Sequence, residues 1–173
     1  MAREDAPADD SRRRFLQSSI VSGLAIAGPG AASDSASDID PAVSTYPDLV
    51  VGKAARLAIN QPLLFTYPDA ASACLAVKLG RRVPDGVGPD LDIVAFSSMC
   101  SHMGCLVSYE AATARLKCAC HFSMFDPEKS GQMIIGQATQ NLPQVILEYR
   151  AADDTVHAVA IRGLIYGRQT NLL

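Results

Sequence analysis

Residues 100–105 read CSHMGC, and residues 118–123 read CACHFS. These two stretches hold four of the five cysteines and two of the three histidines in a chain of 173 residues. Twelve residues separate them. Because thiolates and imidazoles bind zinc, copper and iron, this concentration predicts a metal centre formed by two loops.

Each stretch offers one cysteine and one histidine as a pair of ligands: Cys100 with His102, and Cys118 with His121. Two Cys and two His can close a tetrahedral zinc site, or they can hold a [2Fe–2S] cluster with the two Cys on one iron and the two His on the other. A zinc site leaves Cys105 and Cys120 without a role. In an exported chain these two can join as a disulfide that ties the loops together, which favours the cluster.

The rest of the chain indicates an all-β fold. Gly and Pro together number 22 and Trp is absent, which suits short strands and turns. We expect strands at 72–79, 91–96, 145–149 and 156–161, and a hairpin from 106–109 and 115–117. The region of about 97–141 is expected to be a loop-rich insertion.

Composition narrows the possible partners. Hydrophobic residues make up 49% of the chain and charged residues 19%, which suits a compact domain and argues against disorder. The net charge is -3, and no basic patch interleaves with aromatic residues. Nucleic acid is therefore excluded as a partner.

Residues 1–40 are predicted to be a signal peptide and linker. Residues 11–16 read SRRRFL, and a short apolar stretch and small residues follow. This is the layout of an export leader, and it resembles the twin-arginine type, which carries folded, cofactor-loaded cargo. The apolar stretch is shorter than the ~20 residues that span a bilayer. We therefore expect a periplasmic protein with at most peripheral membrane association.

The pattern C-x-H-x-G-C with C-x-C-H-x-S resembles the signature of Rieske iron–sulfur proteins, most specifically over residues 97–141. It is matched by Cys100, His102, Gly104, Cys105, Cys118, Cys120, His121 and Ser123. The resemblance implies a Rieske domain over residues 41–173, with an antiparallel β-sandwich base and a loop-rich cluster-binding subdomain. It also assigns roles: Cys100 and Cys118 bind the inner iron, His102 and His121 bind the outer iron, and Cys105 and Cys120 form a disulfide.

Three further residues are expected to tune the cluster: Gly104, Ser123 and Phe125. In the family the serine hydroxyl bonds a cluster sulfide and stabilises the reduced state. Phe125 stands where the cytochrome bc members carry a tyrosine whose hydroxyl bonds a ligand sulfur. Phe125 has no donor, so the resemblance implies a lower reduction potential here, unless this ring serves packing alone.

Residues 120–133 and 136–139 resemble the small subunit of arsenite oxidase. This implies an electron-transfer subunit with no substrate site of its own. It would relay electrons from a large subunit, which carries molybdenum–pterin and a [3Fe–4S] cluster and oxidises arsenite, to a soluble cytochrome c or an azurin-type copper protein. The alternative is the Rieske subunit of a quinol-oxidising cytochrome bc complex. That class is expected to carry a firmer anchor, a Tyr at position 125 and a Gly-Pro loop in place of residues 136–143. A zinc-stabilised binding module is the simplest rival.

Four other residues have expected roles. Cys74 is predicted to be a small buried side chain within a strand, and His157 to be structural or at the surface. Met103 and Phe122 adjoin the histidine ligands. They are expected to form an apolar rim that shields the cluster or takes part in docking.

Overall fold

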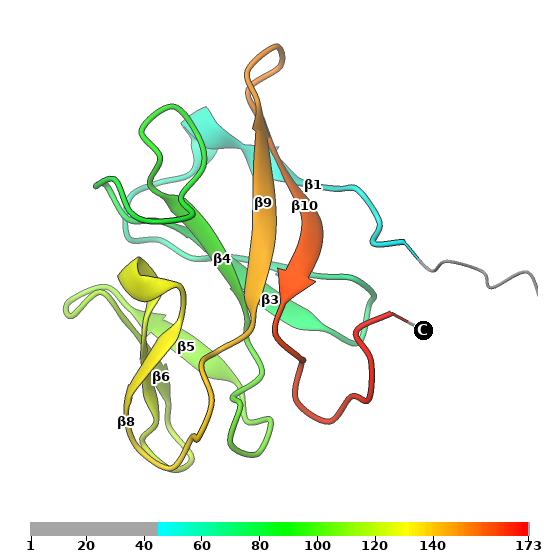
Figure 1. The fold of residues 1–173 in the computed structure, drawn as a ribbon. Helices are drawn as coiled ribbons and strands as arrows, with labels where there is room; N and C mark the ends of the chain where they lie inside the picture. Colours follow the sequence, from blue (N-terminus) through cyan, green and yellow to red (C-terminus); the bar gives the residue numbers. More distant parts are fainter. Residues whose placement is uncertain (1–44, 173) are drawn as a thin grey trace, which may run out of the picture. The chain divides into compact units, whose positions relative to one another are not determined.

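The computed structural model describes residues 45–172 (Figure 1). The leader and linker predicted for residues 1–40 lie outside this range. In the described part the chain is all-β, with ten strands and two short 3-10 helices, Ala54–Arg56 and Pro127–Lys129. The predicted fold class is confirmed. Within residues 45–172, no helix is long and apolar enough to cross a membrane.

Six antiparallel strands form the base sheet, in the order β1-β10-β9-β4-β3-β2. Their bounds are β1 Leu49–Lys53, β2 Leu63–Thr66, β3 Ala73–Lys78, β4 Ile93–Ser97, β9 Gln144–Arg150 and β10 Thr155–Arg162. The four strands predicted individually from the sequence all fall in this sheet.

A second antiparallel sheet carries the predicted metal centre, in the order β5-β6-β7-β8. Its strands are β5 Val107–Glu110, β6 Arg115–Cys118, β7 Met124–Asp126 and β8 Gln132–Ile135. The hairpin of β5 and β6 matches the sequence-based expectation. Strands β7 and β8 do not, because residues 97–141 were expected to be mostly loop beyond that hairpin. Neither strand alternates apolar and polar residues, because Met124 and Phe125 of β7 and residues 133–135 of β8 are consecutive apolar residues.

Strands β3 and β4 lie between two hydrophobic cores. Leu75 and Val77 of β3, with Val94 and Phe96 of β4, face the first core, which continues into the second sheet through Leu116 and Phe125. The alternate residues of the same strands, Cys74, Ala76, Ile93 and Ala95, face a second core completed by β9 and β10. Successive side chains of a strand point to opposite faces. Burial on both faces therefore explains why these strands read as continuous apolar runs.

His157 of β10 contacts Asp48, the residue directly before the edge strand β1. Its ring is buried; Nδ1 lies 2.5 Å from Asp48 Oδ1, and Nε2 lies 2.9 Å from the Thr155 hydroxyl. Arg150 of β9 forms a second ion pair with Asp48. His157 is therefore structural, which was one of its two predicted roles.

We expect this cluster to make stability depend on pH. Hydrogen bonds from Arg150 and then His157 lower the pKa of Asp48 below its ordinary 3.8. A lowered carboxyl pKa adds stability above the unfolded-state value, and that stability is lost as the pH falls through the folded-state value. Asp48→Asn should therefore lower the melting temperature by a few degrees at neutral pH, and this difference should become smaller at acidic pH as Asp48 of the parent is protonated.

The matched control is Glu148→Gln, because Glu148 is exposed on β9 and pairs with His157 across the strands. It should leave melting unchanged at both pH values. An Asp48→Asn difference of equal size at neutral and acidic pH would contradict the assigned ion-pair role.

Candidate metal centre

The first ligand loop, residues 98–106, connects β4 to β5. The Cys100 amide donates to the Cys105 carbonyl, and the Gly104 amide donates back to the Cys100 carbonyl, both at 2.9 Å. These bonds close the segment into a tight turn. Gly104 has φ +72°, in the left-handed region that favours glycine, which explains the glycine of the motif.

The second ligand loop, residues 119–123, connects β6 to β7. The Cys118 amide donates to the Ser123 carbonyl at 2.8 Å, so the chain returns directly over the end of β6. Phe122 has φ +58°, and its side chain is exposed. Cys118 is thus fixed as the last residue of a strand, while His121 is carried on the turn.

The four predicted ligands form a buried pair and an outer pair. Cys100 and Cys118 are almost fully buried and belong to the first core. The rings of His102 and His121 lie edge to face, with centroids 4.7 Å apart and planes at 88°. His121 is exposed and His102 is partly buried. The two thiols thus lie inside and the two imidazoles outside, and the assignment of each pair to one iron stays a prediction.

The donor atoms of this site fit a metal cluster. His102 Nδ1 is buried and has no hydrogen-bond partner within residues 45–172. A buried polar atom left unpaired costs about 1–3 kcal/mol, and ligation to a metal would satisfy it. Burial raises the pKa of Cys100, and the adjacent Cys118 thiol adds to the rise. Binding of a metal by the Cys100 thiol therefore releases a proton.

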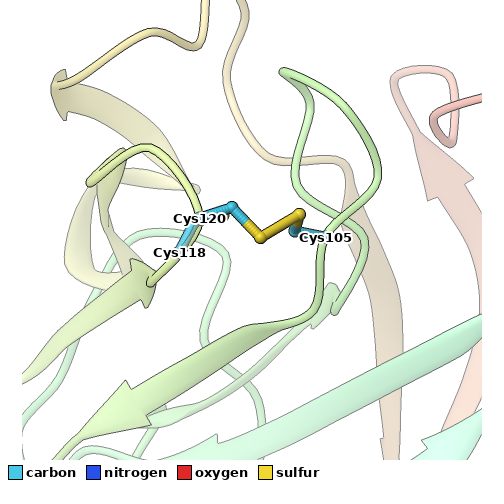
Figure 2. A group of neighbouring side chains, drawn as sticks. All are labelled: Cys105, Cys118 and Cys120. Carbon is cyan, nitrogen blue, oxygen red and sulfur yellow. A yellow bond between two sulfur atoms is a disulfide. The ribbon is translucent and has the colours of Figure 1, made fainter.

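The two ligand loops are joined by the disulfide Cys105–Cys120 (Figure 2), with Cα atoms 6.5 Å apart. The predicted pairing is confirmed. Cys118 Sγ lies within 4.8 Å of both disulfide sulfurs. Disulfide sulfurs carry no thiolate, so of these three cysteines only Cys118 can bind a metal as an anion.

Residues 136–142 form a third segment that lies against both loops. The Ala138 amide donates to the Ser123 hydroxyl at 3.0 Å, and the Ser101 hydroxyl donates to the Gln140 carbonyl at 2.8 Å. A Cβ atom on Gly136 would come within 2.3 Å of Ser123 Cα, so only glycine permits this approach. The resemblance had placed residues 136–143 where the cytochrome bc members carry their Gly-Pro loop, but it gave neither Gly136 nor Ala138 a role of its own.

Ser123 and Phe125 occupy different positions relative to the predicted cluster. The Ser123 side chain is fully buried and its oxygen accepts from Ala138. Its hydroxyl proton therefore remains available for a cluster atom. Phe125 is fully buried in the first core together with Cys100 and Cys118. The ring therefore shares one core with the two cysteines that are the predicted ligands of the inner iron.

We predict that Phe125→Tyr raises the midpoint potential by tens of mV. A hydrogen bond to a charged group is worth about 1.5–3 kcal/mol. Only the part that differs between redox states counts, and a one-electron couple moves about 59 mV per tenfold change. Protein-film voltammetry measures the shift. Phe65→Tyr is the control, because Phe65 packs against the second core. An equal potential in the parent and Phe125→Tyr would show that Phe125 serves packing alone.

The comparisons with known proteins agree with this geometry. The family model of the Rieske [2Fe-2S] domain matches residues 50–146. The chain belongs to this family. The Rieske protein is 39% identical over 166 residues to iodate reductase subunit IdrB of Denitromonas iodatirespirans, covering 93% of this chain and 86% of that subunit. It is 36% identical over 163 residues to the subunit of the same name from Pseudomonas sp. strain SCT, covering 91% and 82%.

The base fold is shared with a solved Rieske structure. The soluble domain of Rieske protein II (soxF) from Sulfolobus acidocaldarius superposes with a TM-score of 0.64 at 24% identity, covering 72% of this chain and 82% of that one. The Rieske domain binds a [2Fe–2S] cluster. Two Cys and two His could also have formed a zinc site, and membership of this family decides in favour of the iron–sulfur cluster. When bound with two imidazole ligands, such a cluster supplies a one-electron couple at roughly -150 to +300 mV.

Cys74 lies apart from the site in this Rieske protein. Its thiol is buried in β3 and donates to the Tyr67 carbonyl at 3.4 Å. Burial raises its pKa to about 12, so the thiol stays protonated and unreactive at neutral pH. The predicted role as a small buried side chain is confirmed.

Proposed function

We propose that the chain is the electron-transfer subunit of an exported molybdenum oxidoreductase, with Cys100, His102, Cys118 and His121 as its cluster ligands. The observation that carries this is the pair of histidines at the outer side of the site, with His121 exposed above two buried cysteines. Electron transfer requires a short path to a partner, and the exposed histidine provides the outer end of such a path.

The surface beside the histidines is suited to transient docking. Phe122 is 79% exposed, Leu106 69% and Met103 59%, and all three lie on or beside the ligand loops. Large exposed apolar side chains near one site mark an interaction surface. We therefore assign the predicted rim of Met103 and Phe122, extended by Leu106, to docking, and we propose a soluble cytochrome c or an azurin-type copper protein as the partner.

In this proposal the substrate binds to the large molybdenum subunit and not to this chain. The near-full-length similarity to two iodate reductase subunits supports iodate reduction. In that direction electrons pass from the soluble donor through this chain to the large subunit, where iodate takes up electrons and protons and oxygen leaves as water. The resemblance of residues 120–133 to arsenite oxidase supports arsenite oxidation as a second candidate, with electrons flowing the opposite way.

Export by the twin-arginine route to the periplasm is part of the proposal. The SRRRFL stretch at residues 11–16 supports it, and so does the disulfide Cys105–Cys120, because disulfides persist in oxidising compartments. A leader of the twin-arginine type also agrees with insertion of the cluster before export.

Purification from the native host tests the proposal. We expect the chain to co-elute with a large molybdenum subunit. In that complex, iodate should reoxidise the pre-reduced Rieske centre, seen as loss of its EPR signal with average g near 1.9. Appearance of that signal on adding arsenite to the oxidised complex would instead establish the second candidate. Isolation with cytochrome b and no molybdenum would overturn the proposal in favour of a quinol-oxidising complex.

A further inference from the structure

The C-terminal segment, residues 163–172, runs on past the end of β10 beside the first ligand loop and then turns back (Figure 1). It is closed on itself by Asn171, whose side chain accepts from the Ile165 amide at 3.0 Å and donates to the Gly163 carbonyl at 2.7 Å. Ile165 is fully buried in the second core. The segment is therefore a fixed part of the domain.

A bidentate ion pair between Arg168 and Asp69 also holds this segment in place. The two terminal nitrogens of Arg168 lie 2.7 and 2.8 Å from the two carboxylate oxygens of Asp69, which lies in the turn between β2 and β3. Paired contacts of this kind set an orientation as well as a position. Tyr166 lies between the Ile165 anchor and the Arg168 anchor, so its backbone has little freedom to move.

The ring of Tyr166 lies directly against the turn of the first ligand loop. A Cβ atom built on Gly104 would be 2.7 Å from Tyr166 Cδ1 and 3.0 Å from Cε1. Ordinary carbon–carbon contacts are about 3.5–4.0 Å, so the ring fills the space that a side chain at position 104 would need. Gly104 thus meets two demands, a left-handed backbone and contact with an aromatic ring.

We propose that Tyr166 is a positioning residue for the cluster site and acts through Gly104. Gly104 lies between the ligand His102 and the disulfide residue Cys105, inside the turn closed by the Cys100 hydrogen bonds. Movement of Gly104 therefore moves both neighbours. The third segment backs the second loop at Ser123, and Tyr166 backs the first. The contact uses ring carbons, so the phenol oxygen is dispensable.

This inference deepens the proposed function, since it concerns the same site, but its test does not depend on the partner. The full chain carrying its cluster is compared as Tyr166→Ala, Tyr166→Phe and the control Leu164→Ala, which alters an exposed apolar residue of the same segment. Two readouts are used: the g-values of the reduced protein, and the rate at which dithiothreitol reduces Cys105–Cys120.

We expect Tyr166→Ala to shift or broaden the g-values and to speed disulfide reduction several-fold. Tyr166→Phe and Leu164→Ala should match the parent. Unchanged g-values and rate in Tyr166→Ala would overturn the inference, and so would an equal change in Leu164→Ala, because the effect would then belong to docking of the whole segment. If Tyr166→Ala yields no folded protein, Tyr166→Leu takes its place under the same criteria.

A double variant tests the contact itself. Gly104→Ala introduces both a clash with the ring and backbone strain, whereas in a Tyr166→Ala background only the strain remains. Contacting residues show such non-additive effects, and independent ones do not. The fold-change in disulfide reduction caused by Gly104→Ala should therefore be smaller in that background. Equal fold-changes in both backgrounds would overturn the contact, whereas failure of the proposed function would appear only in the assay of the native complex.

Discussion

Cys118→Ala is expected to yield a colourless protein that lacks the EPR signal of the reduced cluster. Cys118 ends β6, is almost fully buried and has its amide fixed by the Ser123 carbonyl, so no other residue can move into its place. The two disulfide sulfurs lie within 4.8 Å of Cys118 Sγ, but they cannot serve as thiolates. Mutation of residues that only hydrogen-bond to metal ligands lowers metal affinity 10–100-fold. Loss of a ligand itself should therefore reduce bound iron by more than about tenfold.

Cys74→Ala is the matched control for this experiment. Cys74 is also a buried free cysteine, but it belongs to the second core and lies on the face of β3 that points away from the first core. Its replacement removes a sulfur of the same type without touching the site. The control should keep its iron, its colour and its spectrum. Full iron content in Cys118→Ala, measured together with inorganic sulfide, would remove Cys118 from the ligand set.

The place of the candidate metal centre was predictable from the sequence because its proposed ligands are few in type and close in spacing. The ligand stretches fall on two turns, and the structure brings His102 and His121 together as expected. Strands β3 and β4 were predictable for a related reason. Both of their faces are buried, so they are uniformly apolar and stand out from the flanking turns.

The supports of the site were not predictable, because they depend on distant parts of the chain. Strands β7 and β8 show no alternation of apolar and polar residues. In β8 the neighbouring residues Ile134 and Ile135 are both exposed. The contact between Tyr166 and Gly104 joins residues 62 positions apart in the sequence. Without the fold, nothing about a tyrosine near the C-terminus relates it to a ligand loop.

The second large effect is expected on removing the disulfide with Cys105→Ala and Cys120→Ala together. The two cysteines are 15 residues apart, and closing a loop of this length is worth about 3 kcal/mol in the chain-entropy account. The double variant should therefore still assemble its cluster, because the four proposed ligands remain. It should lose the cluster much faster on warming, as followed by bleaching of the visible absorption.

The single variants should be worse than the double variant, and this ordering is the sharper test. Cys105→Ala leaves a free thiol at Cys120, and Cys120→Ala leaves one at Cys105; each released sulfur lies within 4.8 Å of Cys118 Sγ. A thiol at that distance can compete for Cys118 by forming a new disulfide under oxidising conditions, which removes a ligand. Both alanines together eliminate this competitor. If the single variants hold the cluster as long as the double variant does, Cys118 is protected from exchange, and the disulfide acts on stability alone by restraining the two loops.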